Sequence, residues 1–145
     1  MFDRILKSLL APEPEPLADT DARLALTALL VRIARSDHDY ARAEVETIER
    51  ILARRYGLDR AGVSALLIEA EALEAAAPDT VRFTRAIKEA VPHEERVAVV
   101  ESAWAVVLAD GARADEEDAL MRMVANLLGV GDRESNMARQ RVARG

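Results

Sequence analysis

The chain has 145 residues, which suits a single domain. Half of the residues are hydrophobic, but only 3% are aromatic and 32% are charged; this mixture, rich in Ala, Leu, Glu and Arg, favours helices over a sheet. The absence of cysteine excludes disulfides and Cys-ligated zinc, and the net charge of −6 disfavours a nucleic-acid partner.

Residues 1–10 place apolar side chains at helical spacing, so we expect a short amphipathic N-terminal helix. In residues 11–18 Pro and Glu alternate, which predicts an extended linker, and residues 19–145 make up the expected main domain. The roles left open for the first helix are docking on the main domain, pairing with a partner or with a second copy as a homodimer, and contact with a membrane surface.

No run of apolar residues approaches the roughly 20 that a membrane-spanning helix needs. We also expect no signal peptide, because Asp3, Arg4 and Lys7 interrupt the first apolar pattern. These two expectations together favour a cytoplasmic location.

Apolar periodicity and helix-stopping residues divide the main domain into six helices and a shorter C-terminal one. The stretches 24–34 and 97–109 are apolar nearly all round, which is typical of buried helices. Between and after these two stretches we expect amphipathic helices over about residues 42–56, 60–76, 81–91, 115–128 and 133–142. The sequence therefore predicts an all-α bundle of about six to eight helices, with Trp104 in its core.

Two segments of the chain read alike. Each has a nearly apolar helix, an acidic turn, and an amphipathic helix that ends at a glycine. Aligning Asp37 with Asp110 also aligns Glu44 with Glu117. We therefore expect an internal pseudo-repeat of helical hairpins whose apolar helices pack together.

The acidic turns resemble a pattern of the tellurite resistance protein B (TerB) family. In the second copy Ala109-Asp110-Gly111 follows a hydrophobic helix, and Glu117 stands seven residues past the aspartate. The first copy, Ser36-Asp37-His38-Asp39 with Glu44, keeps both acids but has a histidine where glycine is usual. Similarity extends to Arg82-Phe83-Thr84 and Gly129-Val130.

The resemblance covers roughly residues 20–132. It implies an all-helical, cytoplasmic bundle that is linked by name to tellurite resistance and stress response. At the level of the family it suggests divalent-metal binding by the paired acidic motifs, and it establishes no catalytic reaction.

Two interpretations of the acids stay open. In the first, the aspartates cap helices and the glutamates interact with helix macrodipoles. In the second, packing of the two hairpins brings together Asp37, Glu44, Asp110 and Glu117. Such a cluster repels itself unless it is protonated or binds a cation, and its oxygen ligands would select Ca²⁺, Mg²⁺ or Mn²⁺. The residues that could complete the coordination or orient the ligands are Asp39, Asp115 and Glu116.

We therefore expect a divalent-metal-binding module, with a metal-free adaptor that meets a basic protein partner through an acidic surface as the alternative. A single EF-hand loop does not explain the acids, because Arg42 stands at its glycine position and Ile48 at its bidentate glutamate position. His38 is expected to be a surface counter-ion rather than a ligand. No catalytic motif is recognised, so we expect no enzyme, with metal-assisted hydrolysis the less favoured possibility.

Overall fold

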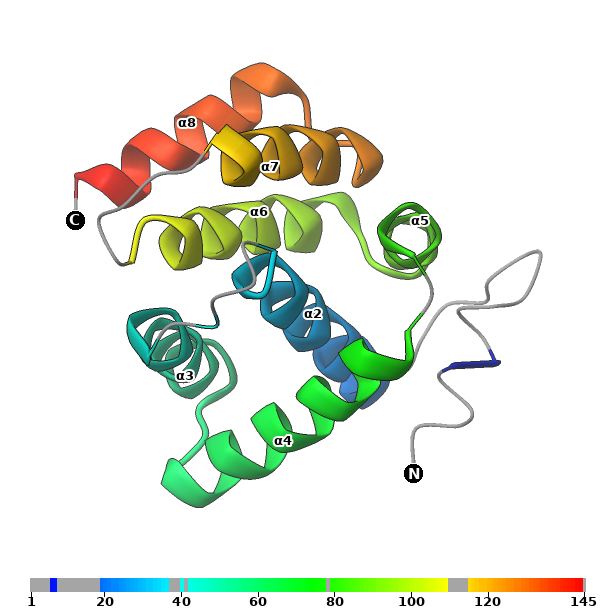
Figure 1. Ribbon diagram of the computed structural model, residues 1–145, viewed down its shortest axis with the longest axis vertical. Coiled ribbons are helices and arrows are strands. Elements are labelled where there is room, and N and C mark those ends of the chain that lie inside the picture. Colours follow the sequence, from blue (N-terminus) through cyan, green and yellow to red (C-terminus); the bar gives the residue numbers. More distant parts are fainter. Residues whose placement is uncertain are drawn as a thin grey trace.

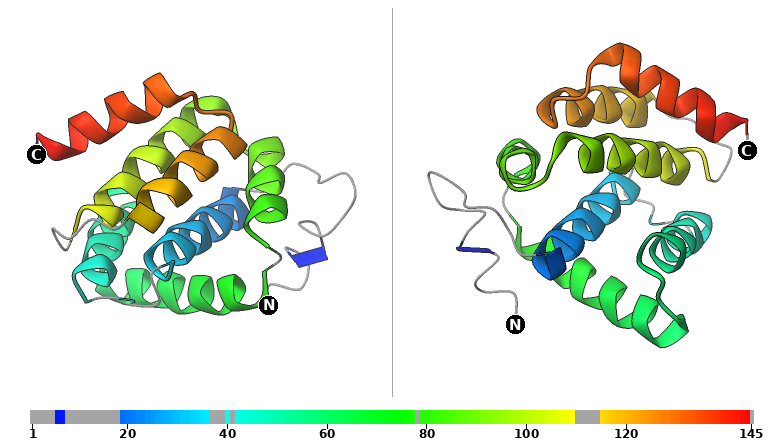
Figure 2. Two further views of the ribbon diagram at one scale, coloured as in Figure 1. Left: turned by 45° about the horizontal axis from the view of Figure 1, so that its top comes forward. Right: turned by 180° about the vertical axis from the view of Figure 1, so that it is seen from behind.

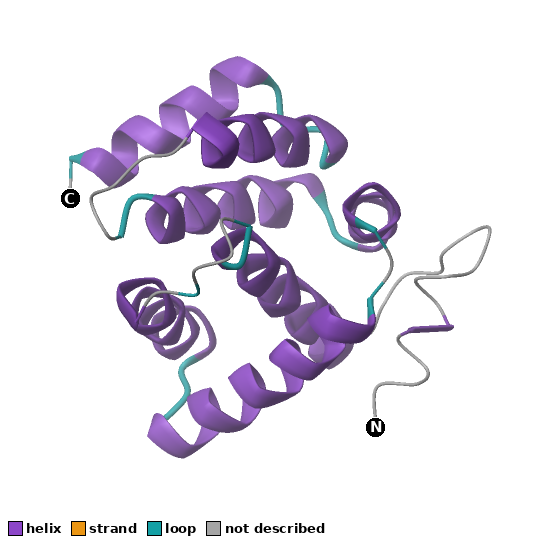
Figure 3. Ribbon diagram, viewed as in Figure 1, coloured by secondary structure: helices purple, strands orange, loops and turns teal. Residues whose placement is uncertain are grey.

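The computed structural model describes residues 6–7, 19–36, 40, 42–77, 79–109 and 115–144. These residues form helices joined by short turns, with no strand among them (Figure 3). The helices are α2 (Asp19–Ala34), α3 (Arg42–Tyr56), α4 (Arg60–Ala76), α5 (Thr80–Ala90), α6 (His93–Val107), α7 (Asp115–Leu127) and α8 (Asp132–Ala143). The predicted all-α bundle is confirmed.

Helix α2 lies at the centre of the bundle, where it contacts α3, α4, α5, α6 and α7 (Figure 1). Nearly every residue from Leu24 to Ala34 is buried, as a helix that is apolar on all sides requires. The one buried polar side chain in this stretch, Thr27, donates its hydroxyl to the Arg23 carbonyl at 2.8 Å. The apolar pattern of the sequence therefore identified the central helix.

The two predicted hairpins are α2–α3 and α6–α7. The two hairpins can be aligned by the spacing that separates Asp37 from Asp110. In this alignment the end of α6 is equivalent to the end of α2, and the start of α7 is equivalent to the start of α3. The apolar helices α2 and α6 pack directly on each other, and each second helix also contacts the first helix of the other hairpin, α3 on α6 and α7 on α2. The structure thus has the pseudo-repeat that the sequence predicts.

Both hairpins end in the same way. Gly57 and Gly129 follow their helices with φ angles of 63° and 75°, a left-handed conformation that glycine adopts without strain. The amide of the next residue then bonds back across the helix end, Leu58 to the Ala53 carbonyl at 3.2 Å and Val130 to the Ala125 carbonyl at 2.8 Å. The predicted helix-stopping role of the glycines is confirmed.

The remaining helices cover the two hairpins. α4 packs on α2 and α3, α5 packs on α2 and α7, and α8 lies on the outer side of α6 and α7 (Figure 2). The buried Trp104 of α6 donates its indole N–H to the Ser135 hydroxyl of α8 at 3.0 Å, so the predicted core residue also ties these two helices together.

Two helix starts can be compared with the sequence. The Asp59 side chain accepts a hydrogen bond from the Gly62 amide at 2.8 Å and caps α4. Pro92 occupies the N-cap position of α6, with extended backbone (φ −62°, ψ 156°). Its missing N–H costs nothing there, and α6 begins at His93.

Most of residues 1–18 lies outside the described residues, including the whole of the predicted linker 11–18. Of the predicted N-terminal helix, Leu6 and Lys7 are described; both are helical, and the half-buried Leu6 packs against the core. Over the described part of the chain, no helix has the length and apolar character needed to cross a membrane.

Candidate functional site

Glu44 is the predicted metal ligand whose side chain the structure describes. It lies in the first turn of α3 and is only 2% exposed. It shares the buried face of α3 with Thr47, Ile48 and Leu52. Glu44, which the sequence pattern associates with the first acidic turn, is therefore buried in the protein interior.

The other predicted ligands are described in part or not at all. Asp37, Asp39 and Asp110 lie outside the described residues, as does His38. The backbone of residues 115–117 forms the first turn of α7, but the side chains of Asp115, Glu116 and Glu117 also fall outside the description. Within the described residues alone, no three His, Cys, Asp or Glu side chains are grouped so that they could hold a metal ion. Convergence of the four acids stays a prediction.

The backbone places Glu44 and Glu117 at equivalent positions. Each is the third residue of its helix, α3 or α7. Four residues later stand Ile48 and Met121, one helical turn further on, and both are fully buried. The two hairpins thus place the backbones of Glu44 and Glu117 at equivalent positions after the two acidic turns.

The burial of Glu44 bears on the two interpretations of the acids. Moving an ionised carboxylate out of water costs several kcal/mol unless charges or hydrogen bonds offset it. The macrodipole of α3 contributes only about 0.3–1 kcal/mol to an acid in the first turn. Glu44 makes at least one hydrogen bond, ion pair or other electrostatic interaction within the protein, so both interpretations of the acids are compatible with its burial.

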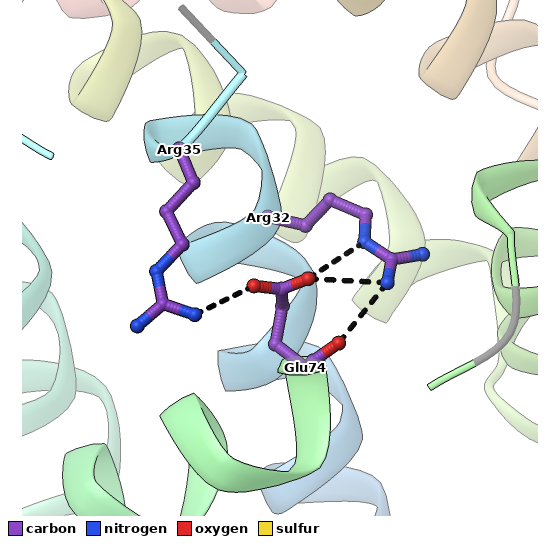
Figure 4. A network of polar contacts seen from close by, with 3 residues as sticks. All are labelled: Arg32, Arg35 and Glu74. Carbon is purple, nitrogen blue, oxygen red and sulfur yellow. Dashed lines mark hydrogen bonds and ion pairs between the residues drawn. The ribbon is translucent and has the colours of Figure 1, made fainter. Parts of the chain in front are cut away.

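The end of α2, directly before the first acidic turn, is held by a network of three residues (Figure 4). Arg32 donates from Nε and Nη2 to one carboxylate oxygen of Glu74, both at 3.1 Å, and from Nη2 to the Glu74 carbonyl at 3.1 Å. Arg35 donates to the second carboxylate oxygen at 2.8 Å. Because Glu74 stands in the last turn of α4, the network fixes the C-terminal end of α2 against α4.

Tyr40 lies on the far side of the first acidic turn and is half-buried. The Arg35 guanidinium lies over its ring, 5.0 Å from the centroid, so one arginine contacts both Glu74 and Tyr40. Burial, and next the nearby Glu71 carboxylate, raise the pKa of Tyr40 well above its usual value of 10.0. The phenol therefore stays neutral beside the turn.

The second acidic turn starts from an equally fixed helix end. Val106 and Val107 are buried, and the amides of Leu108 and Ala109 bond back to the Trp104 and Val106 carbonyls at 3.0 and 3.2 Å. Both acidic turns thus leave from a rigid end of a buried helix, which is the framework that a preorganised ligand site needs.

Sequence reasoning missed the partners of this framework. Arg32 gave a signal, because a lone arginine in an otherwise apolar helix needs a charged partner when it is buried. Nothing in the sequence identified Glu74, which lies 42 residues away, as that partner. Tyr40 gave no signal beyond its place next to the acidic turn.

Fold and site together define a class: an all-helical module built from two similar hairpins, with an acidic turn between the helices of each. The model of one family, described as tellurite resistance protein TerB, matches residues 23–140. The match runs from α2 into α8, so this protein belongs to the TerB family, and the resemblance drawn from the acidic turns is confirmed. Comparisons with curated proteins and with solved structures gave no match.

Proposed function

We propose that this TerB-family module binds a divalent cation through Asp37, Glu44, Asp110 and Glu117. Each hairpin supplies an aspartate from its turn and a glutamate from the first turn of the following helix. The observation that carries the proposal is the burial of Glu44, which is 2% exposed, at a position that the second hairpin repeats with another glutamate. A cation between the hairpins would add to the interactions that already hold the buried Glu44 carboxylate.

The ligand chemistry indicates which cations would bind. Carboxylate oxygens are hard ligands and suit Ca²⁺, Mg²⁺ or Mn²⁺, and neighbouring acids can complete the coordination, namely Asp39, Asp115 and Glu116. A cation held between two hairpins would join them and stabilise the folded state by mass action. We therefore propose a metal-responsive binding module, and we assign it no catalytic step.

The proposal also includes the partner and the cellular location of the module. The net charge of −6 favours a protein partner over a nucleic acid, and the absence of cysteine is compatible with the cytoplasm. A homodimer through residues 1–10 stays a prediction; deleting residues 1–16 and comparing sedimentation of the two forms would test it.

Isothermal titration with CaCl₂, MgCl₂ and MnCl₂ separately tests the metal site. The wild-type protein should bind at least one of the three cations, and the double variant Asp37→Asn with Asp110→Asn should lose that binding. The matched control is Glu69→Gln with Glu94→Gln, which removes the same charge from exposed positions of α4 and α6. The control should bind as the wild type does.

The same variants separate this proposal from a metal-free adaptor. Asparagine caps helices nearly as well as aspartate, so an adaptor whose aspartates act only as caps would keep its stability in the double variant. No binding of any of the three cations by the wild type, or equal binding by the double variant, would refute the metal site.

A further inference from the structure

An open groove of about 520 Å³ is lined by residues of α3, α6 and α8. Part of its lining is apolar or small, from Ile51, Ala98, Ala105 and Val142. Among the described residues that line it, none is aromatic.

The charged lining of the groove is strongly basic. Four arginines line it, Arg50, Arg54 and Arg55 from α3 and Arg141 from α8, against one acid, Glu101 from α6. The whole chain carries a net charge of −6, so the groove has the opposite sign to the molecule around it. A cluster of this kind attracts anionic groups over the range of a Debye length.

Two of these arginines already have carboxylate partners. Arg141 contacts Glu101 through two nitrogens, each 3.0 Å from the same oxygen, and Arg55 forms an ion pair with Glu95 of α6. These pairs tie α8 and α3 to α6 and so hold the two sides of the groove. They are positioning contacts.

The other two arginines, Arg50 and Arg54, have no carboxylate partner among the residues that the structure describes. Arg50 donates a hydrogen bond to the Thr47 hydroxyl at 3.1 Å, and within the described residues neither Arg50 nor Arg54 makes an ion pair. Both side chains are exposed at the groove. Planar guanidinium groups that are not neutralised are suited to paired hydrogen bonds with carboxylates.

We propose that this groove binds an acidic peptide segment of a partner protein. Carboxylates of the segment pair with Arg50 and Arg54, and apolar side chains of the segment contact Ile51 and Val142. A small inorganic anion would use the charge but leave the apolar lining in water. A nucleic acid would lack aromatic side chains for base stacking and would be repelled by the net negative charge of the chain.

Fluorescence anisotropy of a labelled synthetic peptide tests the proposal. The probe is a peptide of about twelve residues that combines glutamates with leucines, which is the composition that such a groove recognises. Two comparison peptides have the same length, one with lysine in place of every glutamate and one with serine in place of every leucine. All titrations contain EDTA, so the outcome does not depend on whether the acidic turns bind a metal.

The Glu/Leu peptide should bind, and its affinity should fall as salt is raised. Arg50→Glu with Arg54→Glu should weaken binding by about tenfold or more, because arginines that pair with carboxylates dominate such interfaces. The matched control, Arg60→Glu with Arg122→Glu, makes the same charge change at exposed positions outside the groove and should bind as the wild type does. Both comparison peptides should bind more weakly than the probe.

Several results would overturn the proposal. These are no binding of the Glu/Leu peptide, equal loss in the control variant, or equal affinity for the serine-containing peptide, which would reduce the groove to a general electrostatic surface. Tighter binding of a labelled oligonucleotide would assign the groove to nucleic acid. If sedimentation shows a concentration-dependent dimer and dimer formation displaces the probe, the groove would be assigned to a second copy of this chain.

Discussion

Arg32 in the buried helix α2 forms a two-nitrogen ion pair with Glu74 at the end of α4, with the side chains 16% and 13% exposed. Glu74 also accepts from Arg35, so its carboxylate lies between the two guanidinium groups (Figure 4). Removing the carboxylate would take away the ion pairs that both arginines make with Glu74 in a partly buried site.

Glu74→Ala should therefore lower the free energy of unfolding by about 2–3 kcal/mol, measured by urea denaturation. The control is Glu46→Ala, which removes an exposed pair with Arg42 whose side chains are 91% and 50% exposed. That change should cost less than about 0.5 kcal/mol. Equal effects of the two substitutions would mean that the Arg32–Glu74 pair contributes no more than a surface pair.

The two helix-ending glycines allow backbone strain to be separated from crowding. Both have positive φ, but an added Cβ at Gly129 would meet Arg96 Nη1 at 3.0 Å and Lys88 Cε at 3.1 Å, whereas at Gly57 it would meet nothing within 4 Å. Gly57→Ala should cost about 1 kcal/mol from strain alone, and Gly129→Ala about 2 kcal/mol.

Thermal or urea unfolding of the two alanine variants measures the difference. The extra loss at position 129 has a specific cause, because Arg96 donates to the Leu128 carbonyl at 2.6 Å and caps the end of α7. A smaller loss at position 129 than at position 57 would contradict this assignment.

Tyr40 predicts a dependence of stability on alkaline pH. Burial and the Glu71 and Glu49 carboxylates raise its pKa in the folded state, and the opposing effect of Arg35 is smaller. The folded protein therefore holds the phenol proton more tightly than the unfolded chain does. This contribution is complete below the unfolded pKa of 10.0 and is lost as the pH rises from there through the folded pKa.

Urea denaturation of the wild type and Tyr40→Phe at about pH 8 and about pH 11 measures the effect. Relative to the phenylalanine variant, the free energy of unfolding of the wild type should fall from the lower to the higher pH, with a limiting slope of about 1.4 kcal/mol per pH unit. A difference between the two proteins that stays constant with pH would show that Tyr40 titrates as it does in the unfolded chain.

The sequence predicted the helices well because their signals are local. The apolar runs in α2 and α6, the Asp59 cap and the two glycines each act within one or two helical turns. The repeat could be read for the same reason, since both hairpins follow one pattern of apolar helix, acidic turn and glycine stop.

The surroundings of the acids could not be predicted in the same way. A glutamate in the first turn of a helix is ordinarily solvated, and the burial of Glu44 arises only when α3 packs into the bundle, where it contacts α2, α4 and α6. The Arg32–Glu74 pair and the arginine groove likewise depend on helices that are distant in sequence. Periodicity identifies which face of a helix is buried but not which charged residue lies opposite it.

Glu44→Gln tests the role of the buried carboxylate in metal binding. A saturating cation that the wild type binds should raise its Tm by about 5–10 °C at a hundred times the Kd, and the glutamine variant should lose most of this rise. The control is Glu46→Gln, which alters an exposed acid of the same helix and should keep the full rise. If both variants showed the same rise in Tm, Glu44 would not be a ligand of the metal.

The central claim is that two acidic turns from different hairpins hold one cation between them. Anomalous diffraction from a crystal soaked in MnCl₂ tests it most directly, because the metal is located independently of the protein atoms. We expect one strong peak about 2.1–2.3 Å from carboxylate oxygens of Asp37 or Glu44 and, on its other side, of Asp110 or Glu117. A peak held by one turn alone, or no peak at all beside Glu44, would contradict the claim.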